Sequence, residues 1–264
     1  MKNLIMIIDR IFIFILAAIH EWGKYMLNDK INILRHWIME SNYTVFFGGA
    51  GVSTESGIPD FRSVDGLYRM KYEVMPEVIL SHSYFIMETA KFFDFYRDKM
   101  IYTEAKPNIT HKKLSELERK GMLDAVITQN IDGLHQMAGS ERVLELHGSV
   151  HRNYCMNCNR FYPLEELLKT VSIPMCECGG IIKPDVVLYE EGLNQELMAE
   201  SIRAISRAEL LIIGGTSLSV YPAAGLIQYY RGSRMVLINK AVTSYDKEPD
   251  LFIQAGLGEV FSRI

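Results

Sequence analysis

Residues 48–62 read Gly-Gly-Ala-Gly-Val-Ser-Thr-Glu-Ser-Gly-Ile-Pro-Asp-Phe-Arg and directly follow the apolar run at residues 45–47. That apolar run is typical of a buried parallel strand. The glycines after it allow a sharp turn and a close approach of the backbone to a ligand, which side chains would prevent. Ser53 and the neighbouring amide groups then suit a phosphate. The stretch therefore predicts a ligand-binding loop at the end of a first strand.

Short apolar runs that favour β-structure recur at five places along the chain: residues 43–47, 125–128, 143–146, 210–213 and 235–238. Helical patterns lie before three of them, at residues 26–40, 111–120 and 194–208. Strands that alternate with helices indicate an α/β fold, here a Rossmann-like parallel sheet with helices on both faces. Ligands of such sheets bind at the carboxyl ends of the strands, where polar and glycine-bearing loops follow in this chain.

The bulk composition limits the classes of partner. The chain has 264 residues and a formal net charge of −4, so a broad basic face for nucleic acid is not expected. We expect a protein of the cytoplasm that binds neither nucleic acid nor membrane. The composition gives no oligomeric state.

The first residues are unusually apolar. The run at residues 11–19 is too short to span a bilayer, and Asp9 and Arg10 precede it directly. One interpretation is a helix that lies on a membrane surface. The other, which we favour, places residues 1–25 outside the domain, as the product of a start codon assigned too early. The folded domain then covers residues 26–264.

All four cysteines lie in one short segment, as Cys155-x2-Cys158 and Cys176-x-Cys178. This clustering favours a metal site in a reducing compartment over a disulfide framework. Four thiolates are the usual closed shell of a structural zinc ion. The alternatives are a redox Cys-x-x-Cys pair or four unrelated buried cysteines. We expect one Zn²⁺ whose role is to fold a segment with little core of its own.

Two segments interrupt the alternation of strands and helices. Residues 68–106 are rich in aromatic side chains at helical spacing, and residues 151–183 hold the cysteines. We expect these two segments to form a small zinc-binding and helical lobe. The Rossmann-like lobe would consist of residues 26–67, 107–150 and 184–264.

Four further predicted strands end in polar groups. Gln129, Asn130 and Asp132 follow the second strand and suit ribose hydroxyls and a carboxamide. His147 follows the third strand, where a histidine can serve as an exposed general base. Residues 214–218 and Asn239 follow the fourth and fifth strands. These groups predict one extended dinucleotide site, and the lack of a Gly-x-Gly-x-x-Gly motif argues against a hydride-transferring dehydrogenase.

From about residue 30 onward, the order and spacing of the motifs resemble the signature of the sirtuin family. The motifs are the four cysteines together with Gly49-Ala-Gly-Val-Ser53, Gly57-Ile-Pro-Asp-Phe-Arg62, Thr128-Gln-Asn-Ile-Asp132, Glu145-Leu-His-Gly148, Lys183-Pro-Asp-Val-Val187 and Gly215-Thr-Ser217. The resemblance implies an NAD-dependent protein-lysine deacylase, above all a deacetylase. Such an enzyme consumes NAD and releases nicotinamide and O-acyl-ADP-ribose.

The resemblance also implies roles for single residues. His147 would be the general base, with Asn130, Asp132 and Arg62 as further catalytic residues. The substrate would be an acylated lysine of a protein or peptide, bound by Val187, Tyr189 and Phe61, with the peptide pairing as an added strand. NAD would be held by Gly49, Ala50, Gly51, Ser53, Asp60, Phe61, Arg62, Gln129, Asn130, Ile131, Asp132, Gly215, Thr216, Ser217, Asn239 and Leu257.

The chain departs from the family pattern in a few places. Gly48 stands where a threonine is common, and Glu190 replaces the usual glycine of a Phe-Gly-Glu-type loop. Neither change removes a group that the chemistry needs. Sirtuins that favour succinyl-lysine or malonyl-lysine resemble one another in a Tyr-x-x-Arg pair and an alanine. Here Lys99 stands at the arginine position of that pair, three residues after Tyr96, and Val64 stands at the alanine position, which favours acetyl or short neutral acyl groups. Tyr96 can equally be a core residue and Lys99 a solvated one.

Two other functions use the same residues. A mono-ADP-ribosyltransferase would bind NAD in the same way and transfer ADP-ribose to a protein. An NAD-sensing binding module would bind NAD without turnover, but it would not need His147 as a base.

Overall fold

The computed structural model describes residues 23, 25–61, 66, 73–241 and 249–264. The expectations for Arg62, for Val64 and for nearly all of residues 1–25 fall outside these ranges.

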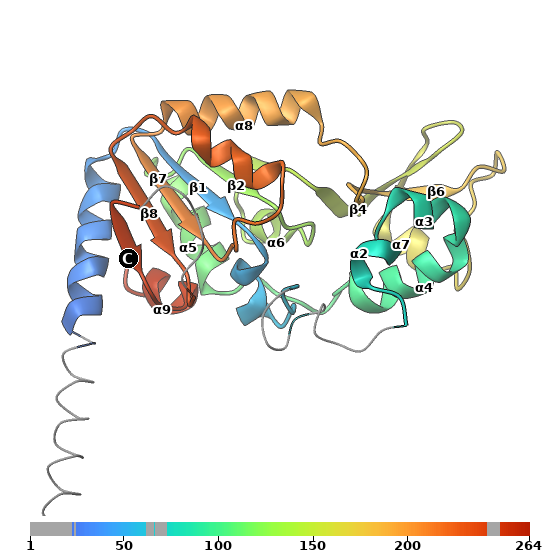
Figure 1. The fold of residues 1–264 in the computed structure, drawn as a ribbon, viewed down its shortest axis with the longest axis horizontal. Coiled ribbons are helices and arrows are strands. Elements are labelled where there is room, and N and C mark those ends of the chain that lie inside the picture. Colours follow the sequence, from blue (N-terminus) through green and yellow to red (C-terminus); the bar gives the residue numbers. More distant parts are fainter. Residues whose placement is uncertain (1–22, 24, 62–65, 67–72, 242–248) are drawn as a thin grey trace, which may run out of the picture.

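The larger lobe is built on a parallel sheet with the strand order β3-β2-β1-β7-β8-β9 (Figure 1). Its strands are β1 (Thr44–Gly48), β2 (Ala125–Thr128), β3 (Val143–Glu145), β7 (Leu210–Gly214), β8 (Arg234–Ile238) and β9 (Leu251–Ile253). The five predicted strands are confirmed within about a residue at each end. β9 was missed, because three residues are too few to show a period-two pattern.

Alternate residues of the central strands face opposite layers of helices. Phe46 of β1 packs in a core with the helix at residues 25–40, with α5 (Ile109–Arg119) and with α9 (Leu257–Phe261). Its neighbours Val45 and Phe47 pack on the other face with α8 (Gln195–Arg207) and η4 (Ala223–Tyr229). Because side chains of a strand alternate in direction, this continuous apolar run is buried on both faces. The predicted Rossmann-like sheet is therefore confirmed.

The smaller lobe combines short helices with an antiparallel sheet. Its helices are α2 (Pro76–Ile79), α3 (His82–Met87), α4 (Thr89–Lys99) and α7 (Leu164–Leu168). Its sheet has the order β5-β4-β6, with β5 (Phe161–Pro163), β4 (Gly148–Cys155) and β6 (Ile182–Val186). β4 and β6 each run across a lobe limit expected from the sequence, at residues 150 and 184.

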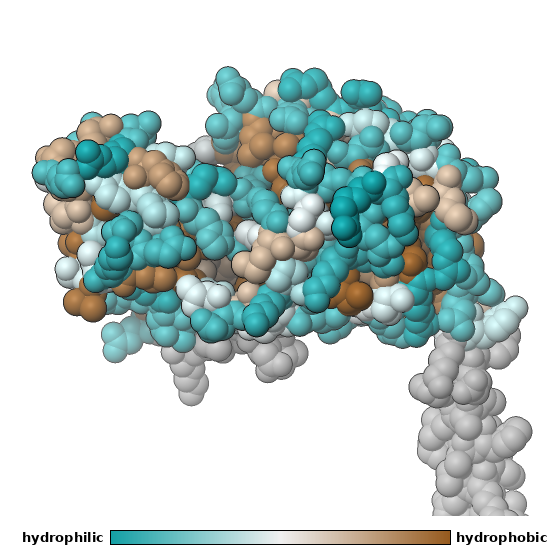
Figure 2. All heavy atoms as spheres, turned by 180° about the vertical axis from the view of Figure 1, so that it is seen from behind, coloured by the Kyte–Doolittle hydropathy of each residue, from teal (hydrophilic) through white to brown (hydrophobic). Residues whose placement is uncertain are grey.

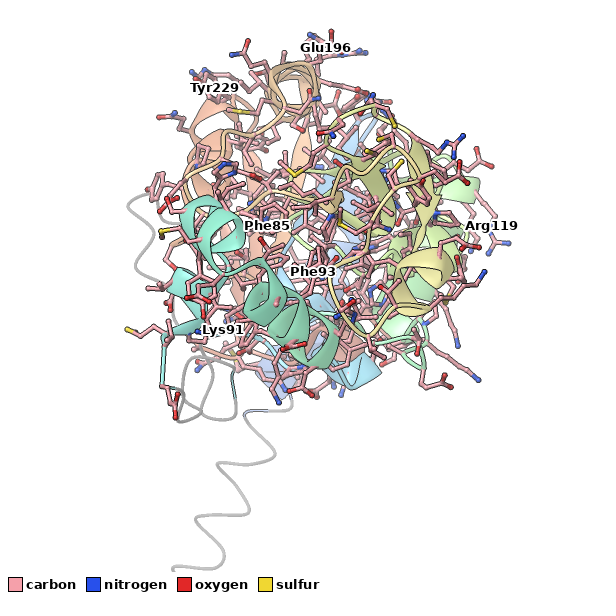
Figure 3. The ribbon with its side chains drawn as sticks, turned by 90° about the vertical axis from the view of Figure 1, so that its right-hand side faces the viewer. Phe85, Lys91, Phe93, Arg119, Glu196 and Tyr229 are labelled. Carbon is pink, nitrogen blue, oxygen red and sulfur yellow. The ribbon has the colours of Figure 1, made fainter. Side chains whose placement is uncertain are left out.

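An aromatic cluster forms the core of the smaller lobe. Phe85, Phe92, Phe93 and Tyr96 are fully buried, and the rings of Phe92 and Tyr96 stack with centroids 5.6 Å apart. Figure 3 shows the side of the molecule on which α3 and α4 carry Phe85 and Phe93. Leu164 and Leu167 of α7 join this cluster. The expectation that the cysteine segment holds little core was thus wrong in part, since α7 packs against β4 and β5 and adds two leucines to the cluster.

The surface seen from behind is mostly hydrophilic, with separate apolar patches on both lobes (Figure 2). Among the described residues, no helix has both the length and the apolar character needed to cross a bilayer.

Replacing Phe92 should test how much the aromatic cluster stabilises the smaller lobe. Phe92 is fully buried, so Phe92→Ala should lower the free energy of unfolding by about 3–5 kcal/mol through lost burial and a cavity. Urea unfolding followed by circular dichroism measures the change. Ile86→Ala on α3 is the control, because Ile86 is 51% exposed and its loss should change the free energy by less than about 0.5 kcal/mol. Equal effects of the two variants would contradict the assigned core.

Candidate active site

A cleft of about 970 Å³ lies between the two lobes. On one side it is lined by the loops that follow β1, β2, β3, β7 and β8, whose carboxyl ends meet at one edge of the parallel sheet. On the other side it is lined by residues of the smaller lobe, among them Leu80, Lys99 and Val150. The cleft therefore lies where an α/β sheet is expected to bind a ligand.

The glycine loop after β1 touches the loop after β7 directly. The first loop forms two short 3-10 turns, η1 (Ala50–Val52) and η2 (Thr54–Ser56). The amide of Gly51 donates to the carbonyl of Gly215 over 2.7 Å. A Cβ atom on Gly51 would lie 2.7 Å from Gly215 Cα, so only glycine allows this contact. Gly215 itself has φ +60°, which also favours glycine.

Three polar side chains join the glycine loop to the loop after β2. The Ser53 hydroxyl donates to Asp132 Oδ2 over 2.6 Å, and Asn130 Nδ2 donates to Ser53 Oγ over 3.0 Å. Ser53 is buried, so its hydroxyl is fixed by these two neighbours. Asp132 Oδ1 accepts from the amide of Leu134, at the start of α6 (Leu134–Met137). Both carboxylate oxygens of Asp132 are thus engaged by the protein, which holds its orientation.

Thr216 links the remaining strand ends. Its hydroxyl accepts from Gln129 Nε2 over 3.0 Å, and its carbonyl accepts from Asn239 Nδ2 over 3.3 Å. The amide of Leu218 also donates to the Thr216 hydroxyl. Residues after β2, β7 and β8 are therefore held in one hydrogen-bonded group.

His147 follows β3 and lines the cleft, and its surroundings decide which nitrogen of its imidazole carries the proton. Its Nδ1 lies 2.9 Å from the carbonyl of Gln129. Because a carbonyl can only accept, Nδ1 carries the proton and Nε2 keeps the lone pair of a base. Burial lowers the pKa of His147, partly offset by this hydrogen bond. The imidazole is therefore neutral at neutral pH, as a general base must be.

The structure brings most of the other sequence-predicted residues to the same cleft. Ala50, Asp60, Phe61, Ile131, Val187, Tyr189, Ser217 and Leu257 all line it. Gly49 does not line the cleft. It packs against Thr216 instead, since a Cβ atom on Gly49 would come 2.8 Å from Thr216 Cβ.

Two supporting residues were missed from the sequence. Asn108 caps α5, and its Nδ2 donates to the carbonyl of Val52 and to Ser56 Oγ, which ties the glycine loop to that helix. Its reciprocal pairing with His111 is a capping box, which the spacing of the two residues could have revealed. His151 Nε2 donates to the carbonyl of Asp132 over 3.1 Å. No local pattern marks His151, because its partner lies on another loop.

Tyr96 is a core residue. It stacks on Phe92 and is fully buried, and burial raises the pKa of its hydroxyl. Lys99 lines the cleft instead. Tyr96 therefore offers no hydroxyl to an acyl group in the cleft.

The four cysteines form one compact group in the smaller lobe. Their sulfur atoms all lie within 4.8 Å of one another, with Cys155 and Cys178 3.4 Å apart and Cys158 and Cys176 3.6 Å apart. Tetrahedral zinc with Zn–S bonds of about 2.3 Å places its sulfur ligands about 3.8 Å apart, so the group fits the ion. The hydroxyl of Tyr162 donates to Cys176 Sγ and would support the thiolate. The convergence excludes four unrelated cysteines, and the group is compatible with a structural zinc site.

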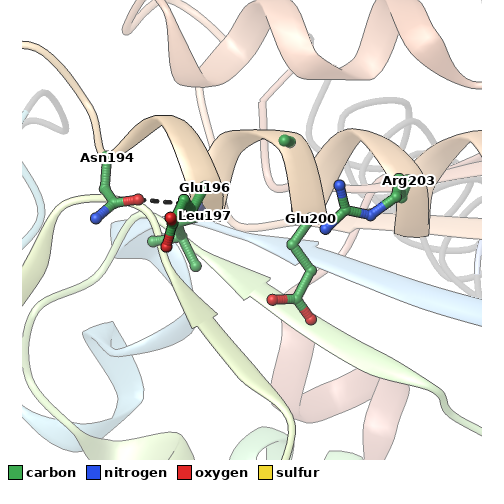
Figure 4. A pocket seen from close by; sticks show the side chains of 6 residues that line it. Asn194, Glu196, Leu197, Glu200 and Arg203 are labelled. Carbon is green, nitrogen blue, oxygen red and sulfur yellow. Dashed lines mark hydrogen bonds between the residues drawn. The ribbon is translucent and has the colours of Figure 1, made fainter.

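A second, shallow depression runs along α8 (Figure 4). It is lined by Asn194, Glu196, Leu197, Ala199, Glu200 and Arg203. None of the sequence-predicted site residues belongs to it. The Asn194 side chain caps the helix there by accepting from the amide of Leu197.

Metal analysis should find about one zinc per chain, since four thiolates complete the shell of a structural ion. Cys158→Ser should lose most of the metal and lower the melting temperature, because zinc binding is coupled to folding of the segment. Glu177→Ser is the control: Glu177 stands between Cys176 and Cys178 but is exposed. Full zinc content in Cys158→Ser would contradict the four-cysteine site.

Comparison with known proteins gives one consistent result. A model of the Sir2 family matches residues 49–222. A protein named NAD-dependent protein deacetylase from Clostridium acetobutylicum is 56% identical over 243 residues, which are 90% of this chain and 99% of that protein.

Comparison with solved structures also finds members of the Sir2 family. One, described as the structural basis for the mechanism and regulation of Sir2 enzymes, has a TM-score of 0.80 and 41% identity and covers 88% of this chain and 95% of that one. A second is a Sir2 structure in complex with the inhibitor EX-527, 2'-O-acetyl-ADP-ribose and a deacetylated p53 peptide. It has a TM-score of 0.76 and 37% sequence identity, and the match covers 88% of this chain and 96% of that chain.

Proposed function

Since this chain belongs to the Sir2 family, we propose that the cleft between its lobes is the active site for deacylation of protein lysines. The protein is an NAD-dependent deacetylase that transfers the acyl group to ADP-ribose and releases nicotinamide. One observation carries the assignment of the site. Ser53, Asn130 and Asp132 form one hydrogen-bonded group beside a neutral His147, and all four line a single cleft.

The donor groups of the cleft fit NAD. Ala50, Gly51 and Ser53, with Thr216 and Ser217, would hold the phosphates through amides and hydroxyls. Gln129 and Asn239 suit the two riboses, and Leu257 gives the adenine an apolar contact. Asn130, Ile131 and Asp132 would hold the nicotinamide end. The contact between Gly51 and Gly215 supports this arrangement, because it brings both phosphate-binding loops to one place.

Bound NAD supplies an electrophilic sugar carbon once nicotinamide leaves. His147 would take a proton at Nε2 from a ribose hydroxyl, which makes that oxygen a nucleophile. Phe61 and Val187 would keep water from the reacting centre. The amide of Val187 donates to the carbonyl of His147 over 3.0 Å, so the wall of the acyl-lysine channel is fixed next to the base. The proposed role of Arg62, which would organise the site, concerns a residue outside the described ranges.

The substrate side of the cleft favours the deacetylase over an ADP-ribosyltransferase. Val187 and Tyr189 line the cleft at the end of β6, where an acyl-lysine peptide can pair as an added strand. We infer that its partners are acylated proteins or peptides. We expect it to bind neither nucleic acid nor membrane, in keeping with the net charge of −4. We place the protein in the cytoplasm, because a four-thiolate site needs a reducing compartment.

Turnover of an acetyl-lysine peptide should strictly require NAD. Mass spectrometry should find one nicotinamide and one O-acetyl-ADP-ribose for each acetyl group removed, because the acyl group passes to the sugar. A succinyl-lysine peptide should react more slowly, since Tyr96 offers no hydroxyl to its carboxylate. The same test can be run with labelled NAD. If the label appears on protein while the peptide stays acetylated, the enzyme is an ADP-ribosyltransferase instead.

His147→Ala should lower kcat by about 10²–10⁴-fold, the usual effect of losing a general base. Burial lowers the pKa of His147, so the neutral base persists as the pH falls. The acid limb of kcat/KM in the parent enzyme should therefore lie below about pH 6.5, the ordinary histidine value.

The control for this prediction is His36→Ala, which removes an exposed histidine paired with Glu40 and should leave both kcat and the pH profile unchanged. Unchanged zinc content shows that His147→Ala is folded. Near-normal turnover of that variant would refute the role of His147 as the base.

A further inference from the structure

The rim of the cleft next to the smaller lobe is formed by residues 188–191, here termed the substrate edge, all of which line the cleft. Its backbone is attached to the turn between α2 and α3. The amide of Tyr189 donates to the carbonyl of Leu80 over 3.0 Å, and the amide of His82 donates to the carbonyl of Tyr189 over 2.9 Å. The substrate edge is thus an extension of the smaller lobe.

Glu190 occupies a backbone conformation that normally selects glycine. Its φ is +77°, in the left-handed region, where a side chain crowds the backbone. Glycine would adopt this conformation without strain. A glutamate at this position therefore needs a compensating interaction elsewhere.

The carboxylate of Glu190 makes that interaction with Ser83 of α3. Glu190 Oε2 accepts from the Ser83 amide over 2.9 Å and from Ser83 Oγ over 2.7 Å. These hydrogen bonds lower the pKa of the Glu190 carboxyl, so it is charged at neutral pH. Charged acceptors form the stronger hydrogen bonds, which offsets the backbone strain.

The neighbouring Glu191 acts differently. Its Oε2 accepts from Lys183 Nζ over 3.1 Å and from the amide of Leu188 over 2.9 Å, within its own loop and strand. Its Oε1 lies 2.8 Å from His82 Nδ1. Glu191 therefore ties the loop both to its own strand and to His82 at the start of α3, whereas, among the described residues, the side chain of Glu190 accepts hydrogen bonds from Ser83 of α3 alone.

We propose that Glu190 is a positioning residue that holds the substrate edge in the conformation that pairs with the acyl-lysine peptide. Within the described part of the chain, the backbone N–H and C=O of Glu190 form no hydrogen bond, so they remain for an incoming strand. Fixing them in advance through Ser83 lowers the ordering cost of peptide binding. This inference rests on the proposed function and concerns peptide affinity, leaving NAD affinity unaffected.

Four variants test this positioning role. Glu190→Ala and Glu190→Gly should each weaken binding of an acetyl-lysine peptide by about 5–30-fold, the effect of one or two kcal/mol. Glu190→Gln keeps a hydrogen-bond acceptor for Ser83, so it should lose less peptide affinity than Glu190→Ala. Ser83→Ala removes the hydroxyl donor but keeps the amide donor, so its loss of peptide affinity should lie between zero and that of Glu190→Ala. Calorimetry with the peptide alone measures affinity, and steady-state kinetics should show a raised KM for peptide with an unchanged KM for NAD.

Glycine tolerates φ +77°, so weakened binding in Glu190→Gly cannot result from misfolding. A double variant of Glu190→Ala with Ser83→Ala should bind no worse than Glu190→Ala alone, because the two residues act through one contact. Glu166→Ala is the matched control: Glu166 is an exposed glutamate of the same lobe that pairs with Lys169. It should leave peptide affinity unchanged.

Several results would overturn the positioning role. One is unchanged affinity in Glu190→Ala and Glu190→Gly. Another is equal losses in Glu190→Gln and Glu190→Ala with normal binding in Ser83→Ala, which would mean that the charge of Glu190 meets the peptide directly. If the parent enzyme binds the peptide but removes no acetyl group, the proposed function fails, while calorimetry still decides the role of Glu190. If it does not bind the peptide, both fail.

Discussion

The site depends first on a contact between two stretches of backbone. The loops after β1 and β7 approach closely enough for the Gly51 amide to reach the Gly215 carbonyl, which leaves no room for a Cβ atom at Gly51. Once the loops are held together, Ser53 on the first can reach Asn130 and Asp132. Thr216 on the second can reach Gln129 and Asn239. A change of even one methyl group at the glycine contact would therefore displace polar groups that the contact itself does not touch.

The same connection that places His147 in the cleft also joins the two lobes. The chain leaves β3 of the parallel sheet, passes through His147 and enters β4 of the antiparallel sheet at Gly148. Gly148 has φ +76°, and a Cβ atom there would lie 1.9 Å from the Asp185 carbonyl, so β6 packs directly against this turn. The far end of the same sheet carries the zinc group, since Cys155 is the last residue of β4. Zinc bound there would thus stabilise a small sheet whose other end fixes the imidazole of His147.

Hydrogen bonds within the protein hold the polar groups of the cleft in place. Asp132 has both oxygens engaged, and the Nδ1 proton of His147 is directed to the Gln129 carbonyl. Side chains that are oriented in advance lose little freedom when a ligand arrives, and they need not reorganise during the reaction. The substrate edge follows the same rule on the other side of the cleft, where Glu190 and Ser83 come from segments 107 residues apart.

Local patterns in the sequence determined the sheet strands, the major helices, the four cysteines that converge in the smaller lobe and most of the residues that line the cleft. They could do so because burial of a strand, helical spacing, cysteine spacing and glycine motifs are all recorded within short windows. Tertiary structure decided the contacts between residues that lie far apart in the sequence, which no short window contains. It packed Gly49 against Thr216, buried Tyr96 among other aromatic rings and added Leu164 and Leu167 to the core of the smaller lobe. It also brought in Asn108 and His151 as supports. Each of these depends on contacts between distant segments, and such contacts leave no periodic trace in the chain.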